Sequence, residues 1–583
     1  MAAQFDLVIR GGTVVDGSGA EPRRADVAVK DGLIVVVGKV DGSGREEIDA
    51  AGLLVTPGFI DLHTHYDGQA IWSQRLNPSS SHGVTTVVMG NCGVGFAPCR
   101  PKDRELLCSA MEGVEDIPGV VMKEGLTWTW ETFPEYLDVV DSRARDIDVG
   151  VFAPHSAVRV YAMGDRGANR EPATDEDLKV MGDIIREAVQ AGALGFASSR
   201  TAIDRRSDGE YVPSFDAAER EMVAAAMAVK EGGGGVIQLI PELGMTGLTA
   251  DEEFALLRHV AEASGQPMTY TLAQGRRDPG FWRRMLDLTN AFNAEGGSLM
   301  HPQYFPRPVG MLAGFDLTSN PFLDCPTYKT LAHLPLAERI VELRKPEIRA
   351  AIIAEEPDDA LMPLTELTRW FDLMYPISEP PNYEPDPASN VVVRARREGK
   401  TPQEIAYDLL LEDDGRAMLL VAISNYAEMS LDHLFAFFDN PHAVMGLGDG
   451  GAHYGLICDS SYPTFVLTHW ARDRQGRRLS LGQAVKAMTS TPAEVVGLRD
   501  RGLIAPGYKA DLNVIDHAGL ALHAPRIVDD LPAGGRRLDQ TATGYRWTIV
   551  SGEVIAKDDL PTGALPGRLV RGAQQPAKVA AYA

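Results

Sequence analysis

From residue 58 onward, short apolar segments alternate with segments of helical character, and this alternation constrains the fold more than any other feature of the chain. A strand buried on both faces is a continuous apolar run, and a helix between two such strands returns the chain for parallel pairing. Thr249 followed by Glu252 matches a capping box, which supports one of the helix starts. The alternation predicts an α/β fold, a TIM-like (β/α)8 barrel. The expected strands are 58–63, 84–91, 148–154, 193–199, 235–240, 267–272, 297–301 and 443–448.

Other parts of the chain depart from this alternation. Both ends contain short strand-like runs separated by Gly and Asp, which predict β structure. Before the last barrel strand there is a long insertion with amphipathic runs at 336–354 and 403–421, which we expect to be helical and to lie on the loop side as a lid. The expected divisions are 1–57 (β), 58–500 (barrel), 309–442 (insertion within the barrel), 501–571 (β) and 572–583 (a polar tail, mobile or docked on a neighbour).

Composition excludes several classes of partner. The formal net charge of the 583 residues is −25, so nucleic acid and anionic membrane surfaces would repel the protein. The five cysteines are odd in number and irregular in spacing, which disfavours a disulfide framework and fits a reducing compartment. No signal peptide and no run of 18 apolar residues stands out, so the expected location is the cytoplasm. The composition is compatible with a homo-oligomer.

Two histidines stand at the end of the first barrel strand. Gly58 to Leu62 is apolar at most positions, and His63 and His65 follow at positions i and i+2. Because side chains alternate along a strand, both imidazoles point to the same side. Two converging neutral imidazoles are ready metal ligands, whereas the plainer interpretation is two surface histidines that coincide.

Cys92 and Asp449 also follow expected strands, and reactive residues of such barrels gather at the carboxyl ends of the strands. Cys92, in Gly-Asn-Cys-Gly, is either a small buried thiol or a thiolate ligand for zinc. Asp449, in a Gly-rich turn, is either a turn residue or a weak ligand that also serves as general base. We assign both to a metal site with His63 and His65.

Other strand ends supply weaker candidates. His155 and His301 are each either a satisfied core histidine or a catalytic donor to the oxyanion, and His453 is a candidate contact beside the metal or substrate. Three arginines are rival partners for a substrate carboxylate, because a guanidinium can pair with it bidentately. They are Arg307, Arg200 and Arg159.

Several motifs resemble the amidohydrolase superfamily and, within it, the D-aminoacylase (N-acyl-D-amino-acid deacylase) family. The resemblance runs over roughly residues 5–555 and implies a metal-bearing barrel plus a small β-sandwich built from both chain ends. The Gly-Asn-Cys-Gly motif is the piece that points to the D-aminoacylase branch. The resembling pieces are Val55–His65, Gly83–Gly93, Gly448–Gly451 and Gly502–Leu512.

The chain also departs from that pattern. Many amidohydrolases bridge two metals with a carboxylated lysine on strand four, whereas residues 180–200 contain no lysine. In the resembling branch a cysteine takes this role, and Cys92 matches its position. That branch also has histidines at the ends of strands five and six, but 236–241 and 268–272 contain none. We therefore expect one zinc ion, held by the four residues assigned above, with recruitment of His301 as the alternative.

Three functions remain open at this point. The first is a metal-dependent amidohydrolase that cleaves an N-acyl-D-amino acid, the substrate that the resemblance implies. The second is a hydrolase of a cyclic amide or another small-molecule amide, because the departures indicate a different pocket. The third is an inactive barrel that only binds a ligand, and retention of both histidines with Asp449 argues against it.

Overall fold

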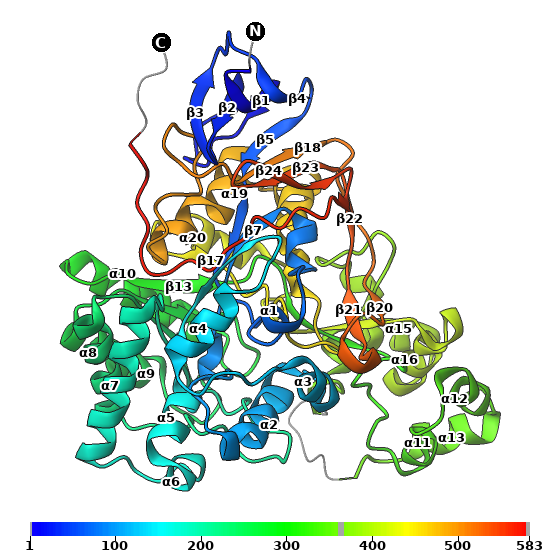
Figure 1. Cartoon of the computed structure of the whole chain (residues 1–583). Helices are drawn as coiled ribbons and strands as arrows, with labels where there is room; N and C mark the ends of the chain where they lie inside the picture. Colours follow the sequence, from blue (N-terminus) through cyan, green and yellow to red (C-terminus); the bar gives the residue numbers. More distant parts are fainter. Residues whose placement is uncertain (1–2, 359–365, 579–583) are drawn as a thin grey trace.

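The structure, a computed structural model, describes residues 3–358 and 366–578. Nine parallel strand segments occupy the eight places where the sequence predicts strands, because Phe152 interrupts one of them. In Figure 1 the helices of residues 175–295 lie on the left and those of residues 326–410 on the right. The seventh strand was predicted too early in the chain, and the eighth is shorter than expected. The segments are β6 (Phe59–Asp61), β7 (Val84–Met89), β8 (Asp148–Val151), β9 (Ala153–Pro154), β10 (Gly195–Ser199), β11 (Val236–Ile240), β12 (Met268–Thr271), β13 (Met300–Tyr304) and β17 (Val444–Met445).

These strands pair in chain order in two runs, β6-β7-β8 and β9-β10-β11-β12-β13-β17. The first and last strands are also linked beyond their ends. Asp449 N donates to His63 O at 3.1 Å, and His65 N donates to Gly450 O at 2.8 Å. The residues after β17 and after β6 are therefore held side by side, which brings the two candidate histidines next to Asp449.

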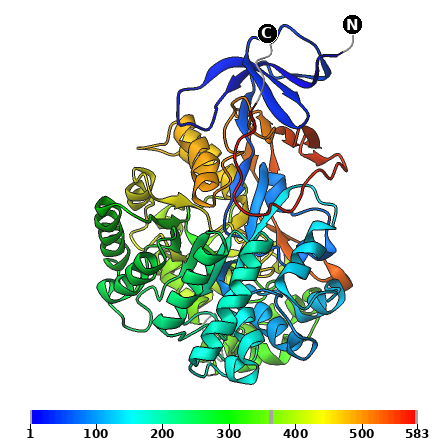
Figure 2. The same ribbon diagram turned by 60° about the vertical axis from the view of Figure 1, so that its left-hand side comes forward.

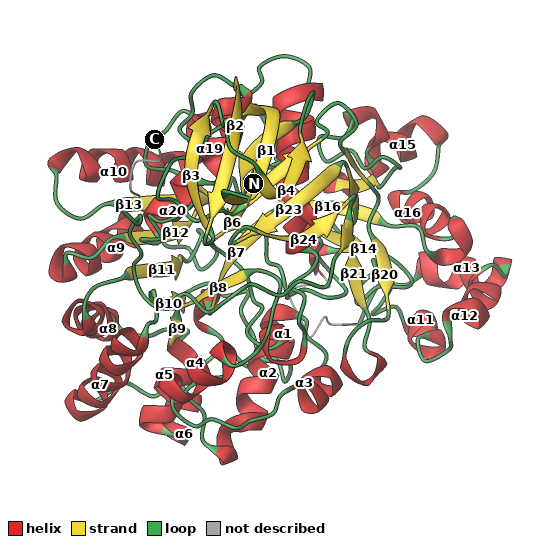
Figure 3. Ribbon diagram, turned by 45° about the horizontal axis from the view of Figure 1, so that its top comes forward, coloured by secondary structure: helices red, strands yellow, loops and turns green. Residues whose placement is uncertain are grey.

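Helices lie outside the parallel strands (Figure 3). The capping box expected at Thr249 is present, Thr174 and Ser480 form two more, and each opens a helix of this outer layer. The outer helices are α4 (Phe133–Asp141), α7 (Asp175–Ala191), α8 (Glu219–Gly232), α9 (Ala250–Ser264), α10 (Phe281–Glu295), α19 (Leu481–Met488) and α20 (Ser490–Val495). Further helices are α1 (Gln69–Trp72), α2 (Arg104–Glu115), α3 (Gly119–Gly125), α5 (His155–Met163), α6 (Asp165–Ala168), α17 (Phe435–Phe438) and α18 (Tyr462–Phe465).

Both chain ends contribute to one mixed sheet, as the sequence predicts, and it lies at one end of the molecule (Figure 2). Where a sandwich was expected, its nine strands pair as a single sheet, in the order β25-β24-β23-β18-β5-β1-β2-β3 with β4 beside β1. The strands are β1 (Phe5–Val14), β2 (Arg23–Lys30), β3 (Leu33–Gly38), β4 (Gly44–Asp49), β5 (Leu54–Pro57), β18 (Leu512–Ile515), β23 (Tyr545–Val550), β24 (Glu553–Lys557) and β25 (Leu560–Pro561).

The insertion before the last parallel strand has its own apolar core and is only partly helical. The run expected to be helical over 336–354 is helical, in two helices, because Pro346 starts a second one. The helix expected over 403–421 ends at Leu410, and a strand follows. Its elements are α11 (Pro326–Leu331), α12 (Leu336–Leu343), α13 (Pro346–Ala354), α15 (Val391–Glu398), α16 (Pro402–Leu410) and the antiparallel strands β14 (Val309–Ala313), β16 (Leu419–Ser424) and β15 (Met374–Pro376).

Two short antiparallel strand pairs complete the β structure, β19 (Ala521–Leu522) with β22 (Ala542–Thr543) and β20 (Arg526–Val528) with β21 (Arg537–Asp539). The start of the tail is docked on its own chain, since Gln574 N donates to Gly497 O and Ala577 N to Gly507 O; residues 579–583 lie outside the described part. All five cysteines are free. Within residues 3–358 and 366–578, no helix is long and apolar enough to cross a membrane.

Candidate metal centre

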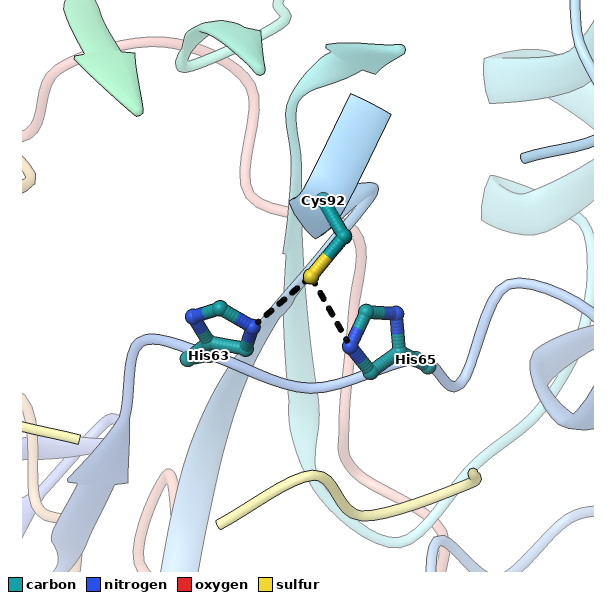
Figure 4. A group of neighbouring side chains, drawn as sticks. All are labelled: His63, His65 and Cys92. Carbon is teal, nitrogen blue, oxygen red and sulfur yellow. Dashed lines mark hydrogen bonds between the residues drawn. The ribbon is translucent and has the colours of Figure 1, made fainter. Parts of the chain in front are cut away.

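Three side chains converge where β6 and β7 end (Figure 4). Cys92 Sγ lies 3.3 Å from His63 Nε2 and 3.8 Å from His65 Nε2, and the three donor atoms lie within 4.8 Å of one another. Asp449 Oδ1 lies 3.5 Å from His63 Nε2 and 3.7 Å from His65 Nε2. The four residues assigned to the metal site from the sequence therefore face one another.

These separations suit a zinc ion. With bond lengths of about 2.0–2.1 Å to nitrogen or oxygen and about 2.3 Å to sulfur, neighbouring ligands of a tetrahedral zinc stand about 3.3–3.6 Å apart. The four contacts between the histidines and Cys92 or Asp449 span 3.3–3.8 Å. Two imidazoles, a thiol and a carboxylate also form a donor set typical of zinc. His63, His65 and Cys92 thus fit the metal together, and Asp449 lies beside the two imidazoles as an oxygen donor.

A tight loop after β7 places Cys92. Gly90 and Cys92 both have positive φ, at 82° and 55°, so the chain turns back toward β6. Gly90 N donates to Asp67 Oδ2 at 3.1 Å, and Asn91 Nδ2 donates to Val88 O at 2.9 Å. Cys92 N donates to Gln238 Oε1 at 3.2 Å. A non-glycine residue at positive φ is strained, and such strain persists where its surroundings fix it, as these bonds do.

An oxygen lies behind the second ring nitrogen of each histidine, and for His63 it is a hydrogen-bond partner. His63 Nδ1 lies 2.8 Å from Gln303 Oε1, and His65 Nδ1 lies 3.1 Å from Glu115 Oε1. An oxygen beside Nδ1 favours the tautomer with its proton there, which leaves the lone pair of Nε2 for a metal. Both Nε2 atoms face Cys92, so the two rings are set as ligands (Figure 4).

Burial sets the charge states. It lowers the pKa of His63 to about 4 despite the opposing contact with Gln303, and it lowers that of His65 well below the usual range. Both imidazoles are therefore neutral near pH 7, the form that binds metal. Burial also raises the pKa of the Cys92 thiol and of the Asp449 carboxyl well above their ordinary values. A cation among these groups would offset that cost, because it favours their ionised forms.

The four residues line a cavity of about 200 Å³. Loops after the parallel strands and strands of the insertion form its wall, which is mostly aliphatic. His453 also lines it, with Nε2 3.6 Å from Glu115 Oε2. A pocket with apolar walls and a few convergent polar groups is typical of small-molecule sites.

The two histidines predicted as oxyanion donors lie elsewhere. His155 contacts Ser198 Oγ and Glu221 Oε1, both at 2.8 Å, within a buried network, and it does not line the cavity. His301 is the second residue of β13, so it lies near the strand's amino end and contacts His442 O at 2.9 Å. The residue of β13 that reaches the site is instead Gln303, two residues later, whose Oε1 contacts Nδ1 of His63.

The three candidate arginines are each held by a buried carboxylate. Arg307 Nη2 lies 2.7 Å from Asp459 Oδ1, Arg200 Nε lies 3.2 Å from Glu253 Oε1, and Arg159 pairs with Glu221. The cavity lining includes none of them. Of the expected substrate contacts, His453 alone stands in the cavity wall.

Sequence reasoning missed two acidic residues of the cavity, Glu115 and Asp204. Glu115 is the last residue of α2 and lies between His65 and His453. Asp204 lies in the loop after β10, and burial raises its pKa to about 7. Neither belongs to a motif, so only their position in the segments that follow parallel strands could have drawn attention to them.

The chain as a whole is similar to several known proteins. The N-acyl-D-aspartate deacylase of Alcaligenes xylosoxydans xylosoxydans is 28% identical over 527 residues, which cover 89% of this chain and 87% of the relative. The N-acyl-D-glutamate deacylase of that organism is 26% identical and covers 98% and 97%. The solved structure of D-aminoacylase shares the fold with a TM-score of 0.63, 23% identity and coverage of 97% and 100%. The family model described as "Amidohydrolase family" matches residues 46–556, and the chain therefore belongs to the amidohydrolase family.

Proposed function

We propose that this protein is a metal-dependent hydrolase of an amide C–N bond outside peptide backbones. The convergence of His63, His65, Cys92 and Asp449 at one wall of a cavity carries the proposal. Zinc is the metal that we propose, because the donor set and spacing suit it. A solved N-acyl-D-glutamate deacylase from Bordetella bronchiseptica is described as complexed with zinc.

When bound, the metal would lower the pKa of a water toward about 7 and polarise the substrate carbonyl. Asp449 is the proposed general base: it takes the proton of the attacking water and returns it to the leaving amine. Its side chain is 14% exposed, compared with 1% for His63 and His65, so it is open to the cavity. His453 is the histidine that faces the same cavity and can donate to the oxyanion, a role that was expected of His155 or His301.

We propose a single metal ion. The interior position of β11 nearest Cys92 holds Gln238, whose amide accepts from Cys92 N, and Gln303 stands behind His63. An amide oxygen is a weak ligand for zinc compared with imidazole. For D-aminoacylase, a binuclear centre with one-metal activation and second-metal attenuation has been described.

Two substrate classes remain candidates within this function. N-acyl-D-amino acids follow from the relatives, which are named as N-acyl-D-aspartate and N-acyl-D-glutamate deacylases. Another small-molecule amide, cyclic or acyclic, is favoured by the aliphatic cavity wall. The alternative function, an inactive barrel that only binds a ligand, is disfavoured because the donor set is intact.

The test combines metal content with turnover. Zinc-loaded protein should bind about one ion and release free amine from at least one member of a panel of N-acyl-D- and L-amino acids, cyclic amides and neutral amides. Asp449→Asn should lower kcat by about 10²–10⁴, the range for loss of a general base. Asp439→Asn, a surface change near β17 that removes the ion pair with Arg477, is the matched control. If zinc-loaded protein turned over none of these compounds, the proposed hydrolase function would be refuted.

For the fold, we propose that the eight parallel strand positions form one closed barrel. The hydrogen bonds between the residues after β17 and those after β6 support closure. We retain residues 58–500 as the barrel with the insertion 309–442, and 1–57 with 501–571 as a second domain, because the mixed sheet draws its strands from both ends.

A further inference from the structure

We infer that the substrate is a neutral, apolar amide without a carboxylate next to the scissile bond. The inference rests on the proposed hydrolase function and narrows its substrate class. It follows from what lines the cavity together with the metal site, namely aliphatic side chains and acidic groups.

The rest of the cavity wall is largely aliphatic. Leu243 follows β11, Met311 belongs to β14 and Ile423 to β16, and Ile457 comes from the loop after Asp449. More than half of the lining residues are aliphatic or methionine. Such a wall gains free energy by burying apolar surface and offers no partner to a charged group.

The charged groups of the cavity are acidic. Besides Asp449, Glu115 and Asp204 face the cavity. One divalent ion carries two positive charges, which the Cys92 thiolate and Asp449 carboxylate would neutralise. Glu115 and Asp204 add no cation, and Asp204, whose pKa burial raises to about 7, is partly ionised near neutral pH, so a carboxylate placed beside it is repelled and loses its hydration.

No arginine or lysine lines this cavity. All arginines and lysines of the chain fall within residues 3–358 and 366–578, so each of them is placed by the structure. The carboxylates that hold Arg200, Arg307 and Arg159 keep them out of the cavity. A pocket built for an N-acyl-amino acid would need a cation or several donors for the α-carboxylate.

A second cavity of about 120 Å³ extends the apolar region, sharing Ile203, Leu243 and Ile423 with the first. Trp370 also lines it, which favours a bulky apolar group at one end of the substrate. Arg276 and Arg277 line this second cavity, but their side chains are 40% and 56% exposed and face Asp372 and Glu366. They are the competing route by which a carboxylate could be bound.

Paired compounds test the inference. N-butanoyl-D-leucine and N-butanoyl-3-methylbutylamine share the acyl group and the side-chain skeleton, and only the first has a carboxylate. With zinc-loaded protein we expect kcat/KM to be at least about tenfold higher for the neutral compound. A higher value for the carboxylate compound would overturn the inference, and loss of that carboxylate preference in Arg277→Gln would then assign it to the second cavity.

Calorimetric binding to the zinc-loaded protein separates this inference from the proposed function. If neither these two compounds nor any compound of the panel is hydrolysed, the hydrolase proposal fails, but tighter binding of the neutral compound still supports the inference. Tighter binding of the carboxylate compound, or binding of neither, overturns it. Asp204→Asn should reduce the preference for the neutral compound about fivefold, because it removes one acidic group from the wall. Asp208→Asn, in the same loop but outside the cavity lining, should leave the preference unchanged.

Discussion

Gln303 Oε1 lies 2.8 Å from His63 Nδ1, and both residues are buried. This contact joins the end of β13 to the residues just after β6, so a neutral amide fixes the ring and the tautomer of a proposed ligand. A carboxylate takes the same place behind His65, where Glu115 Oε1 lies 3.1 Å from Nδ1. The contact of His63 is a hydrogen bond and that of His65 is not, so the two histidines are supported unequally.

Gln303→Leu should weaken zinc binding about tenfold or more, because His63 loses the acceptor that orients it. Competition with a chelator measures the affinity. Gln303→Glu is the matched control: it keeps an acceptor at the same place, so its zinc affinity should equal or exceed that of the wild type. Unchanged affinity in Gln303→Leu would contradict the proposed support.

Cys92→Ala should lower zinc affinity and remove the thiolate-to-metal charge-transfer band of the cobalt(II)-substituted protein. The physical reason is loss of the sulfur donor that faces both Nε2 atoms. Cys108→Ala is the control, since Cys108 is another partly buried thiol but lies on α2. Retention of the band in Cys92→Ala would show that the metal binds elsewhere.

The sequence predicts most of the parallel strands and the four proposed metal ligands, because these depend on short-range patterns. His63 and His65 share one strand end, and Cys92 and Asp449 stand in glycine-rich turns. Glu115 was not predictable in this way, since its approach to His65 depends on where α2 ends in space. Tertiary placement of this kind leaves no mark in a local pattern.

His301 was predicted at the site in place of Gln303 because of where the strand was expected to end. A small error in the bounds of β13 moved the expected strand end from one to the other. Arg307 was expected in the pocket, but its partner Asp459 is 152 residues away in the chain, and no local pattern announces such an ion pair.

Gly90→Ala should both destabilise the protein and weaken metal binding. Gly90 has a φ of 82°, and a Cβ there would lie 2.3 Å from Phe152 O, so the loop that carries Cys92 must shift. We expect a loss of about 3 kcal/mol in the free energy of unfolding. Gly209→Ala is matched in φ, at 87°, but has open space, and should cost about 1–2 kcal/mol with zinc affinity retained. Urea unfolding and chelator competition give the two quantities, and equal zinc affinities in both variants would argue against the loop's role.

The ionisation of Glu221 should make the free energy of unfolding depend on pH in the acidic range. Burial by itself would raise its pKa, but the contacts with His155 and Arg159 lower it from 4.5 to about 2. A depressed carboxyl pKa stabilises the folded state above the unfolded value of 4.5, and this stabilisation is lost as the pH falls toward 2. Its magnitude is about 3 kcal/mol at pH 7 and about 2 kcal/mol near pH 3.5.

Glu221→Gln should therefore lower the free energy of unfolding by about 3 kcal/mol at pH 7 and by less near pH 3.5, as measured by urea unfolding at both values. Glu231→Gln removes an exposed partner of Arg186 and should cost about 0.5 kcal/mol or less at either pH. A difference between wild type and Glu221→Gln that stays constant over this range would mean that the carboxylate is not ionised by its contacts with His155 and Arg159. The cost would then come from packing alone, and the buried network would be a neutral one.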